Sequence, residues 1–470
     1  MRPPVPRQRG AAPASGPLLL ADAVAAAEAF TAEAAAADVA VAADVAVFPS
    51  LQRQREVLHP VSGRHVVVVG INYAPEPTGI APYTTDTVSH LSTHAAAVTV
   101  LTGVPHYPSW QVPAPYRQRL RFREQVVQPQ RQPVRLERLR HYVPSRQTAL
   151  TRALYELSFY AQLAAFRLRR APDLVVAVTP SVGGAVAASR LARRHGVPFV
   201  VVVQDLMAKA AGQSGIAGGG LVAGATARIE REALRHADRV VIVSEAFREQ
   251  VRAYGVPDRR IALVPNWSHV APSSLSRDEA RAALGWPARP FTVVHTGNIG
   301  LKQDLGNLVD AGRLVSVDTR VVIVGDGSQR ASVEELARGV GNVAFVDPLA
   351  DAEYPLALAA ADLLVVNERP SVGDMSLPSK LTSYLRAGRP VLAAVAEGGA
   401  TARELDRTGG AAVRVPAGDP SALASAVRML RDDPARRARM SAAAASFAAA
   451  ELGREAAMAR LDAVIEGAMG

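Results

Sequence analysis

The sequence contains no cysteine, which excludes structural disulfides and thiolate zinc sites and makes the reducing cytosol the simpler location. No uninterrupted apolar run reaches the length of about 18 residues that a membrane-spanning helix needs. The alanine-rich stretch of residues 18–47 is interrupted by acidic residues, namely Asp22, Glu28, Glu33, Asp38 and Asp44. The chain therefore lacks the sequence signals of a disulfide-stabilised or membrane-spanning protein.

Two further absences narrow the function. A dinucleotide-binding enzyme would carry a short G-x-G-x-x-G turn after its first strand, and the loop beginning at Gly70 has none, which argues against an NAD enzyme. The arginine-rich region between Tyr116 and Arg170 has few aromatic residues among its arginines, and the chain shows no helix-turn-helix or RNA-binding signature. Nucleic acid is therefore not an expected partner.

What is present is typical of a globular protein. Its length of 470 residues is enough for two or three ordinary domains. Of these residues, 49% are hydrophobic and 20% charged, as in soluble globular proteins. Residues 1–62 form a low-complexity extension that we expect to be disordered, and we assign it no function. The net charge is +10, and the basic region between Tyr116 and Arg170 is either a solvated surface or a site for anionic lipid headgroups or a polyphosphate-linked acceptor.

Apolar strands alternate with helical segments from Arg64 onward. The runs are apolar on both faces, as in parallel sheets covered by helices. A proline- and serine-rich break at residues 265–290 separates two such series. We therefore predict an α/β protein with two Rossmann-like domains facing across a cleft, one over residues 63–270 and the other over residues 271–440, with residues 441–470 as a C-terminal helix.

The second series contains a helix start that suits an anion. Pro378 ends a loop, Ser379 is a good N-cap residue, and Lys380 follows it. A helix N-terminus offers free N–H groups to an anion, and the lysine adds a full charge. The pattern favours a diphosphate site, although an ordinary capped helix with a surface lysine fits it as well.

A loop after the strand at residues 291–295 has the same character. Gly297 and Gly300 would let the backbone approach a ligand, Lys302 could reach its phosphates, and Asp304 is expected to cap the following helix. A plain turn with a solvated lysine explains the pattern equally well. The turn at Gly325-Asp326-Gly327 is a weaker signal of the same kind.

Candidate residues of the first series also follow strands. Asp205 stands directly after the apolar run 199–203, where a carboxylate would reach the edge of a cleft and could act as a base or an electrostatic partner for a hydroxyl, or could simply cap a turn. The loop after residues 65–69 contains Tyr73 and Gly79. His106 and Trp110 follow another strand, where aromatic rings could stack on a sugar.

Taken together, these segments resemble the group 1 glycosyltransferases, a retaining family of GT-B fold also called family 4, and more narrowly the bacterial colanic-acid and exopolysaccharide type. The segments that carry the resemblance are 70–76 with 78–80, 105–110, Gln204-Asp205, 265–267, 296–298, 324–327, Asp374 and 377–380. They follow the family's order over roughly 400 residues.

The resemblance implies transfer of a sugar from a nucleotide diphosphate to a hydroxyl with retention, in exopolysaccharide or cell-surface glycan synthesis. It makes residues 63–270 the acceptor-side domain and residues 271–440 the nucleotide-sugar-binding domain. The implied donor-binding residues are Gly79, Gly297, Asn298, Lys302, Asp374, Ser379 and Lys380. Asp205 is the implied catalytic residue, and Tyr73, His106 and Trp110 lie on the acceptor side. No metal or cofactor is implied. We expect a polyprenyl-diphosphate-linked glycan as acceptor and peripheral contact with the anionic inner face of the plasma membrane.

The chain also departs from the family pattern. Asp374 stands near the first of two glutamates that many members carry, and Leu381–Ser383 occupy the second, so the ribose contact is not assigned. The usual arginine ahead of Lys302 is missing, and Asp205 stands where many members have a histidine. Two alternatives remain open at this point, a nucleotide-sugar epimerase of the same fold and a catalytically degenerate partner subunit.

Overall fold

The computed structural model describes residues 59–127, 131–146, 148–206, 219–372 and 378–470. Within this part of the chain, no helix combines the length and the apolar character needed to cross a bilayer. The predicted extension, residues 1–62, falls almost entirely outside the described residues, as does Asp374.

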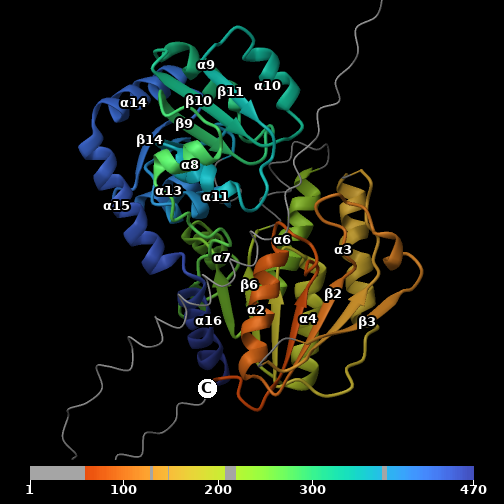
Figure 1. Ribbon diagram of the computed structural model, residues 1–470. Coiled ribbons are helices and arrows are strands. Elements are labelled where there is room, and N and C mark those ends of the chain that lie inside the picture. Colours follow the sequence, from red (N-terminus) through yellow and green to blue (C-terminus); the bar gives the residue numbers. More distant parts are fainter. Residues whose placement is uncertain (1–58, 128–130, 147, 207–218, 373–377) are drawn as a thin grey trace, which may run out of the picture. The chain divides into compact units, whose positions relative to one another are not determined.

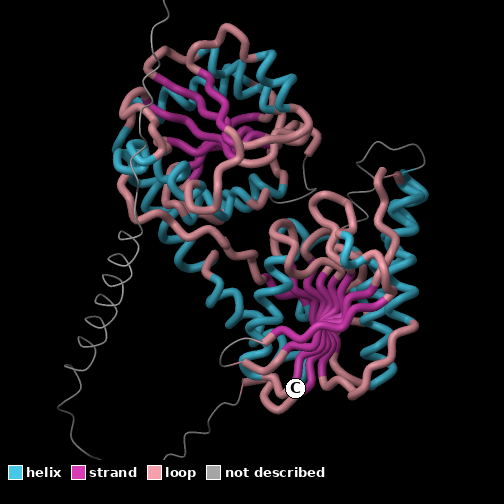
Figure 2. The backbone as a smooth tube through the Cα atoms, turned by 45° about the vertical axis from the view of Figure 1, so that its right-hand side comes forward, coloured by secondary structure: helices cyan, strands magenta, loops and turns pink. Residues whose placement is uncertain are grey.

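The first sheet has eight strands in the order β3-β4-β2-β1-β5-β6-β7-β8, and all neighbours are parallel except β3 and β4. The strands are β1 (His65–Gly70), β2 (Ala97–Gly103), β3 (Arg121–Val126), β4 (Val134–Leu139), β5 (Leu174–Val178), β6 (Phe199–Val203), β7 (Arg239–Ile242) and β8 (Ile261–Leu263). Every residue of β1, β5 and β6 is buried, as expected for valine-rich strands covered on both faces (Figure 2).

The helices of this domain are α2 (Ala81–His94), α3 (Ala149–Ala164), α4 (Val182–His195), α6 (Gly219–Arg235) and α7 (Arg248–Ala253), with single turns η1 (Ala114–Tyr116), η2 (Glu245–Phe247) and η3 (Asp258–Arg260). Ser181 caps the start of α4, where its side chain accepts a hydrogen bond from Gly184 N, and Gly196 caps the end of α4 with a φ of 65°. The left-handed backbone at this position suits glycine, which is common just after the end of a helix.

The second sheet has six parallel strands in the order β11-β10-β9-β12-β13-β14. Its strands are β9 (Phe291–Thr296), β10 (Thr319–Val324), β11 (Val343–Val346), β12 (Leu363–Asn367), β13 (Val391–Val395) and β14 (Ala412–Pro416). Its helices are α8 (Arg277–Ala283), α9 (Leu305–Leu314), α10 (Arg330–Leu336), α11 (Tyr354–Ala360), α12 (Lys380–Arg386), α13 (Ala400–Asp406) and α14 (Pro420–Asp432). Buried clusters on the two faces of this sheet form the core, so the prediction of two parallel α/β sheets is confirmed.

The order of the strands marks where a ligand is expected. In the second sheet, β9 lies between β10 and β12, so the chain winds in one direction from β9 and then in the other. In such sheets ligands bind outside the carboxyl ends of the two strands at this switch point. The corresponding pair in the first sheet is β1 and β5.

The C-terminal segment differs from the single helix expected there. It forms α15 (Pro434–Glu451) and α16 (Arg454–Met469), which are separated at Leu452 and Gly453. Helix α16, labelled in Figure 1, buries Met458, Leu461 and Ile465 in the core of the first domain, and it contacts β7. The last helix therefore belongs to the packing of the first sheet.

The basic region contains regular structure that the sequence analysis did not identify. Strand β3 is an edge strand whose residues alternate between exposed and half-buried, with Arg121 and Arg123 on the exposed side. This two-residue period was a usable signal, but the charge of the region concealed it. Helix α3 follows, with a capping box between Thr148 and Thr151.

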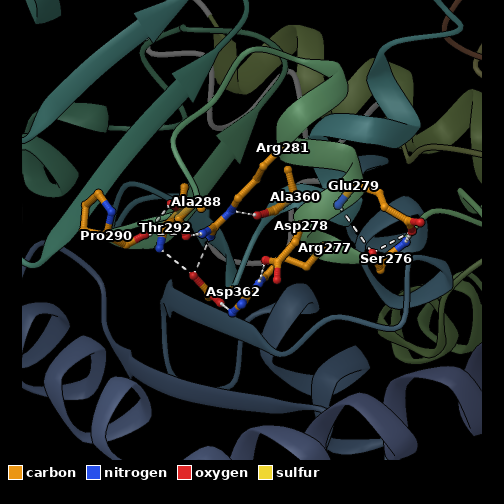
Figure 3. A network of polar contacts seen from close by, with 10 residues as sticks. All are labelled: Ser276, Arg277, Asp278, Glu279, Arg281, Ala288, Pro290, Thr292, Ala360 and Asp362. Atoms are coloured by element: carbon orange, nitrogen blue, oxygen red, sulfur yellow. Dashed lines mark hydrogen bonds and ion pairs between the residues drawn. The ribbon is translucent and has the colours of Figure 1, made fainter.

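A polar network fastens α8 to the amino end of β12, away from the carboxyl ends where a ligand is expected. Asp362 accepts hydrogen bonds from Arg281 Nη2 at 2.6 Å and from Thr292 N at 2.8 Å. Its other oxygen lies 2.5 Å from Arg277 Nη1. Arg281 is itself buried and also donates to the carbonyl oxygens of Ala360 and Ala288 (Figure 3). Both charges are thus fully paired, as buried charges must be.

Candidate functional site

The loop after β9 lies at the switch point of the second sheet. Gly297 N donates to Val324 O, and Ile299 N donates to Asp326 O, so this loop continues the pairing with the turn after β10. A Cβ added at Gly325 would stand 2.0 Å from Gly297 O, and one at Gly327 would stand 2.4 Å from Ile299 O. The glycines that the sequence analysis singled out therefore allow two neighbouring loops to pack backbone against backbone.

Lys380 reaches this loop from the start of α12. Its Nζ lies 2.8 Å from His295 Nε2. A Cβ on Gly297 would be 3.6 Å from the same Nζ. His295 Nδ1 lies 3.0 Å from Val365 O, so the ring proton belongs on Nδ1 and Nε2 accepts from the lysine. The structure thus brings together two predicted donor-binding residues, Gly297 and Lys380.

The electrostatics of this pair follow from burial. Burial, with the nearby Lys380 charge, holds the pKa of His295 well below its ordinary value, so the ring is neutral. Burial also lowers the pKa of Lys380 to about 7, although Glu368 acts in the opposite direction. The ammonium has no carboxylate bonded to it among the described residues. An anion placed beside it would strengthen the hold on its proton.

Glu368 is a site residue that the sequence analysis missed. It follows β12 directly, at the other side of the switch point, and its Oε1 accepts from Thr401 Oγ1 at 2.8 Å. Burial raises its pKa to about 6, while the charges of Lys380 and Lys302 partly offset this rise. A signal was present in the sequence, because Asn367-Glu368 are polar residues at the carboxyl end of an apolar strand.

Hydroxyl groups fix the end of β9 beneath the loop. Tyr384 OH accepts from Thr296 N at 2.7 Å, and Tyr354 OH lies 2.9 Å from Thr296 Oγ1. Tyr384 lies on α12 and Tyr354 on α11, and both side chains pack in the same cluster on one face of the sheet. Burial raises the pKa of Tyr354, so its hydroxyl is neutral and can keep this bond. These bonds connect the end of β9 to α12, and so fix the position of Gly297 relative to Lys380.

Two capping expectations for this region were wrong. Ser379 stands at the N-cap position of α12, but its side chain makes no capping bond because its backbone is already helical. Asp304 precedes α9 with a left-handed φ of 46° and likewise makes no side-chain cap. The backbone carbonyls of Gln303 and Asp304 instead accept from Asn367 Nδ2 at 2.8 and 2.9 Å. That amide, and not a cap, orders the loop.

The remaining donor-side candidates are exposed. Asn298 and Lys302 are solvent-exposed, with Asn298 Nδ2 at 3.4 Å from Gln303 Oε1. The backbone carbonyl of Lys302 accepts from Arg369 N at 2.9 Å, and the Lys302 side chain is exposed to solvent. Both side chains can therefore meet a ligand that lies over Gly297, and their donor contacts stay predictions.

Glu76 organises the loops of the first domain. Its Oε1 accepts from the backbone N–H groups of His106 and Tyr107 at 2.8 and 2.9 Å, and its Oε2 accepts from Asn72 Nδ2 at 2.8 Å. This buried carboxylate ties the loop after β1 to the loop after β2. Gly79 lies next to Tyr107, and a Cβ there would stand 2.9 Å from that ring. With its φ of 71°, the position suits glycine.

The acceptor-side candidates are more buried than an open sugar site requires. Tyr73 is 5% exposed, and burial raises its pKa to about 12. His106 is 2% exposed, with Nε2 at 3.0 Å from Tyr155 OH. Trp110 is half-buried, with a left-handed φ of 54°, and Arg152 lies over its ring. His106 and Tyr73 thus support the loop in this structure, and an acceptor contact stays a prediction.

Asp205 follows β6, as predicted. Burial raises its pKa to about 6, and the positive charge of Lys302 acts in the opposite direction. Its carbonyl accepts from Thr179 Oγ1 at 3.3 Å, and Thr179 itself follows β5, the switch-point strand. Neighbouring Gln204 forms a reciprocal amide pair with Asn266 at 2.8 and 3.1 Å. The carboxyl group thus stands on a firmly held backbone, with a pKa suited to proton transfer near neutrality.

Comparisons with known proteins agree with this geometry. Residues 78–267 match the glycosyl transferase 4-like domain, and residues 290–433 match the glycosyl transferases group 1 domain. The chain is 33% identical over 340 residues to a putative colanic acid biosynthesis glycosyl transferase, WcaI, of Escherichia coli K12, covering 69% of this chain and 81% of that protein.

Solved structures share the fold. HepE of Anabaena in complex with UDP superposes with a TM-score of 0.60 at 16% identity, over 85% of this chain and 98% of that one. Sucrose-phosphate synthase of Thermosynechococcus elongatus gives a TM-score of 0.63 at 18% identity, over 85% and 97%. With two parallel α/β sheets, GT-B neighbours and matching domains along both halves, the chain belongs to the group 1 glycosyltransferases.

Proposed function

We propose that this glycosyltransferase moves a sugar from a nucleotide diphosphate to a hydroxyl of a glycan or lipid-linked acceptor with retention of the anomeric configuration. The observation that carries the proposal is the Lys380–His295 pair beside Gly297 at the switch point of the second sheet. An ammonium with a lowered pKa and no bonded carboxylate, next to a glycine backbone, suits a diphosphate.

The lysine's task would be electrostatic. When the bond between the sugar C1 and the β-phosphate oxygen breaks, negative charge grows on the leaving diphosphate. Lys380, with Lys302 and the N–H groups of the loop at Gly297, would stabilise that charge. His295 keeps the ammonium in position from below, because its neutral Nε2 can only accept from it. Cationic side chains of the protein would thus stabilise the charge on the leaving diphosphate.

Asp205 would serve the acceptor side of the reaction. The acceptor oxygen forms the new bond to C1, the bond from C1 to the phosphate oxygen breaks, and the hydroxyl proton must leave. A carboxylate with a pKa of about 6 is mostly ionised at neutral pH and can accept that proton. Asp205 is therefore our candidate base.

The surface of α3 supports a lipid-linked acceptor and peripheral contact with a membrane. Leu150, Leu154 and Leu157 are 70%, 44% and 61% exposed, and their spacing places them on one side of the helix. Exposed alanines at positions 153, 161 and 164 extend this apolar stripe. An apolar stripe on a surface helix suits the boundary between lipid headgroups and acyl chains.

A basic hollow of about 450 Å³ lies near the end of α3. Its basic lining consists of Arg119, Arg121, Arg123, Arg135, Arg167 and Arg169. Arg123 and Arg135 share Glu137, whereas no carboxylate among the described residues lies within ion-pair distance of Arg119, Arg167 or Arg169. The apolar stripe and these three arginines together suit an anionic lipid surface or a polyprenyl diphosphate, because the leucines can contact acyl chains and the arginines can bind phosphate groups.

Two relatives indicate which substrates to try first. HepE is described in complex with UDP-glucose, and WcaI is described as a putative colanic acid enzyme. We infer a UDP-sugar donor and a role in exopolysaccharide synthesis as the first hypotheses. The test is to incubate the protein with UDP-glucose and candidate acceptors, and to follow the anomeric proton by NMR. An α-linked product from the α-linked donor is expected, and a β-linked product would overturn retention.

A further inference from the structure

A cluster of three histidines and one aspartate lies away from the donor loop, in the first domain. His90 and His94 stand four residues apart on α2 and therefore on one face of it. Asp462 comes from α16, and His59 precedes β1. Nothing in the proposed transfer reaction uses these residues, so their convergence from three segments calls for its own explanation.

The geometry of the cluster is that of a ligand set. His90 Nε2 lies 2.9 Å from both oxygens of Asp462, and His59 Nε2 lies 3.0 Å from Oδ2. One ligand atom from each of these three residues can be chosen such that all lie within 4.8 Å of one another. Such spacing fits donors around one ion, whose bonds to nitrogen and oxygen are about 2.0–2.2 Å long for zinc.

A second, independent observation points the same way. His59 Nε2 is shielded from solvent and makes no hydrogen bond of acceptable geometry, although it lies 3.0 Å from the carboxylate. A buried imidazole nitrogen aimed at a carboxylate without a proper bond costs free energy unless something lies between them. The side chains of His59, His90 and Asp462 are 15%, 16% and 20% exposed, so an ion could still enter.

We propose that His59, His90 and Asp462 bind a divalent transition-metal ion, with zinc as the ion that a site of two imidazoles and a carboxylate favours. The fourth position would be taken by water or by His94, whose ring stacks on that of His59 at 3.8 Å. Because its ligands come from the segment before β1, from α2 and from α16, the ion would fasten the last helix of the chain to the first domain.

The chain simplifies the test because it has no cysteine that could bind zinc. The full-length protein, prepared without a polyhistidine tag, is titrated with Zn²⁺ against a chelating dye. One equivalent bound with a micromolar or lower dissociation constant is expected, together with a rise in melting temperature. His90→Asn and Asp462→Asn should each weaken binding at least tenfold. His195→Asn, an exposed histidine on α4, is the matched control and should bind as the unmodified protein does.

Cobalt spectroscopy separates a metal site from a merely stabilising ion pair. Co²⁺ bound by nitrogen and oxygen in a four-coordinate site absorbs visible light strongly, whatever its effect on stability. We expect this absorption in the unmodified protein and in His195→Asn, and its loss in Asp462→Asn. His94→Ala reports whether His94 is the fourth ligand through a change in the band position. Absence of both zinc binding and the cobalt band in the folded, unmodified protein would overturn the proposal.

Discussion

At the scale of single residues, the proposed donor site depends on how tightly the ammonium group of Lys380 holds its proton. Lys380 is a partly buried cation beside a neutral histidine, and burial lowers its pKa to about 7. A bound diphosphate would raise that pKa again, so that binding takes up a proton wherever the free lysine has lost one. Burial thus makes donor affinity depend on pH in a predictable direction.

Donor binding is accordingly expected to weaken as pH rises above 7. Below pH 7 the free lysine is already protonated and the dissociation constant should be constant. Above pH 7 it should rise toward tenfold per pH unit until the pKa of the complex is reached. Calorimetry at pH 8 in two buffers of different ionisation enthalpy should give about one proton taken up per donor bound.

The matched variants are Lys380→Met and Lys302→Met, one lysine partly buried and one exposed. Lys380→Met should lose about 10- to 100-fold in donor affinity, since a hydrogen bond to a charged group contributes roughly 1.5–3 kcal/mol, and it should also lose the pH dependence. Lys302→Met should lose less and keep it. A pH dependence that survives Lys380→Met would show that another group takes up the proton.

Asp205 gives a second expectation at this scale. Asp205→Asn keeps the size of the side chain and removes its ability to accept a proton, so kcat should fall by about 10²–10⁴ while donor affinity stays within a few fold. Single-turnover kinetics with saturating donor measure this directly. Turnover close to that of the unmodified enzyme, in a folded variant, would show that Asp205 is not the base.

Single residues also show what the sequence could and could not foretell. Gly297, Lys302 and Asp205 were identified because each follows an apolar strand, and the end of an apolar run can be recognised in the sequence. Glu368 also follows an apolar strand, but it was missed because the interpretation concentrated on the glycine and lysine motifs. The Lys380–His295 pair was beyond reach, because β9 and α12 meet only once the sheet has formed. Burial of His106 and Tyr73 likewise depends on packing from distant segments.

At the scale of elements, α3 and α8 illustrate two different uses of a helix. Helix α8 fits its sheet closely, with its arginines bonded to Asp362 (Figure 3). Helix α3 packs with Tyr155 and Phe159 inward and leaves leucines outward. The first arrangement serves stability, and the second leaves apolar surface for a partner, which we take to be lipid.

For α3, the expected result is binding to vesicles that contain anionic lipid. Vesicles with about 30% phosphatidylglycerol should sediment the protein at low salt, and salt should weaken binding because arginines contribute. Replacing Leu154 and Leu157 together by serine should reduce binding severalfold. Leu336→Ser, an exposed leucine on α10 of the other domain, is the matched control. Equal binding by both variants would exclude α3 as the contact surface.

For α8, replacing the shared carboxylate should be costly. Asp362→Asn leaves the guanidinium group of Arg281 buried beside a neutral amide, and the loss of one member of a buried pair typically costs 3–5 kcal/mol of unfolding free energy. Asp278→Asn removes the exposed partner of Arg277 and should leave the free energy of unfolding nearly unchanged, because solvent screens this pair. Urea denaturation compares the two variants, and similar midpoints would contradict the role given to Asp362.

Element prediction succeeded where strands are buried and failed where they lie at an edge. The valine-rich strands β1, β5, β6 and β9 stand out in sequence because both of their faces are apolar. Strand β3 is half exposed and carries arginines, so its period of two was hidden by its charge. The break between α15 and α16 was missed because alanine-rich sequence continues on both sides of Gly453.

At the scale of the whole molecule, we propose that two sheets of related winding contribute different halves of one reaction. Each sheet has its switch point between the strand that starts its series and the strand on the other side, β1 with β5 and β9 with β12. The cationic group stands at the second switch point, and Asp205 follows the strand beside β5 in the first sheet.

The account depends most on donor binding at the Lys380–His295 pair. The most direct measurement is calorimetric titration of the full-length protein with UDP-, GDP- and dTDP-sugars at pH 7, with Lys380→Met in parallel. The account predicts that one nucleotide class binds with a single site and that Lys380→Met weakens it by about 10-fold or more. Unchanged affinity in Lys380→Met, for whichever nucleotide sugar binds, would contradict it.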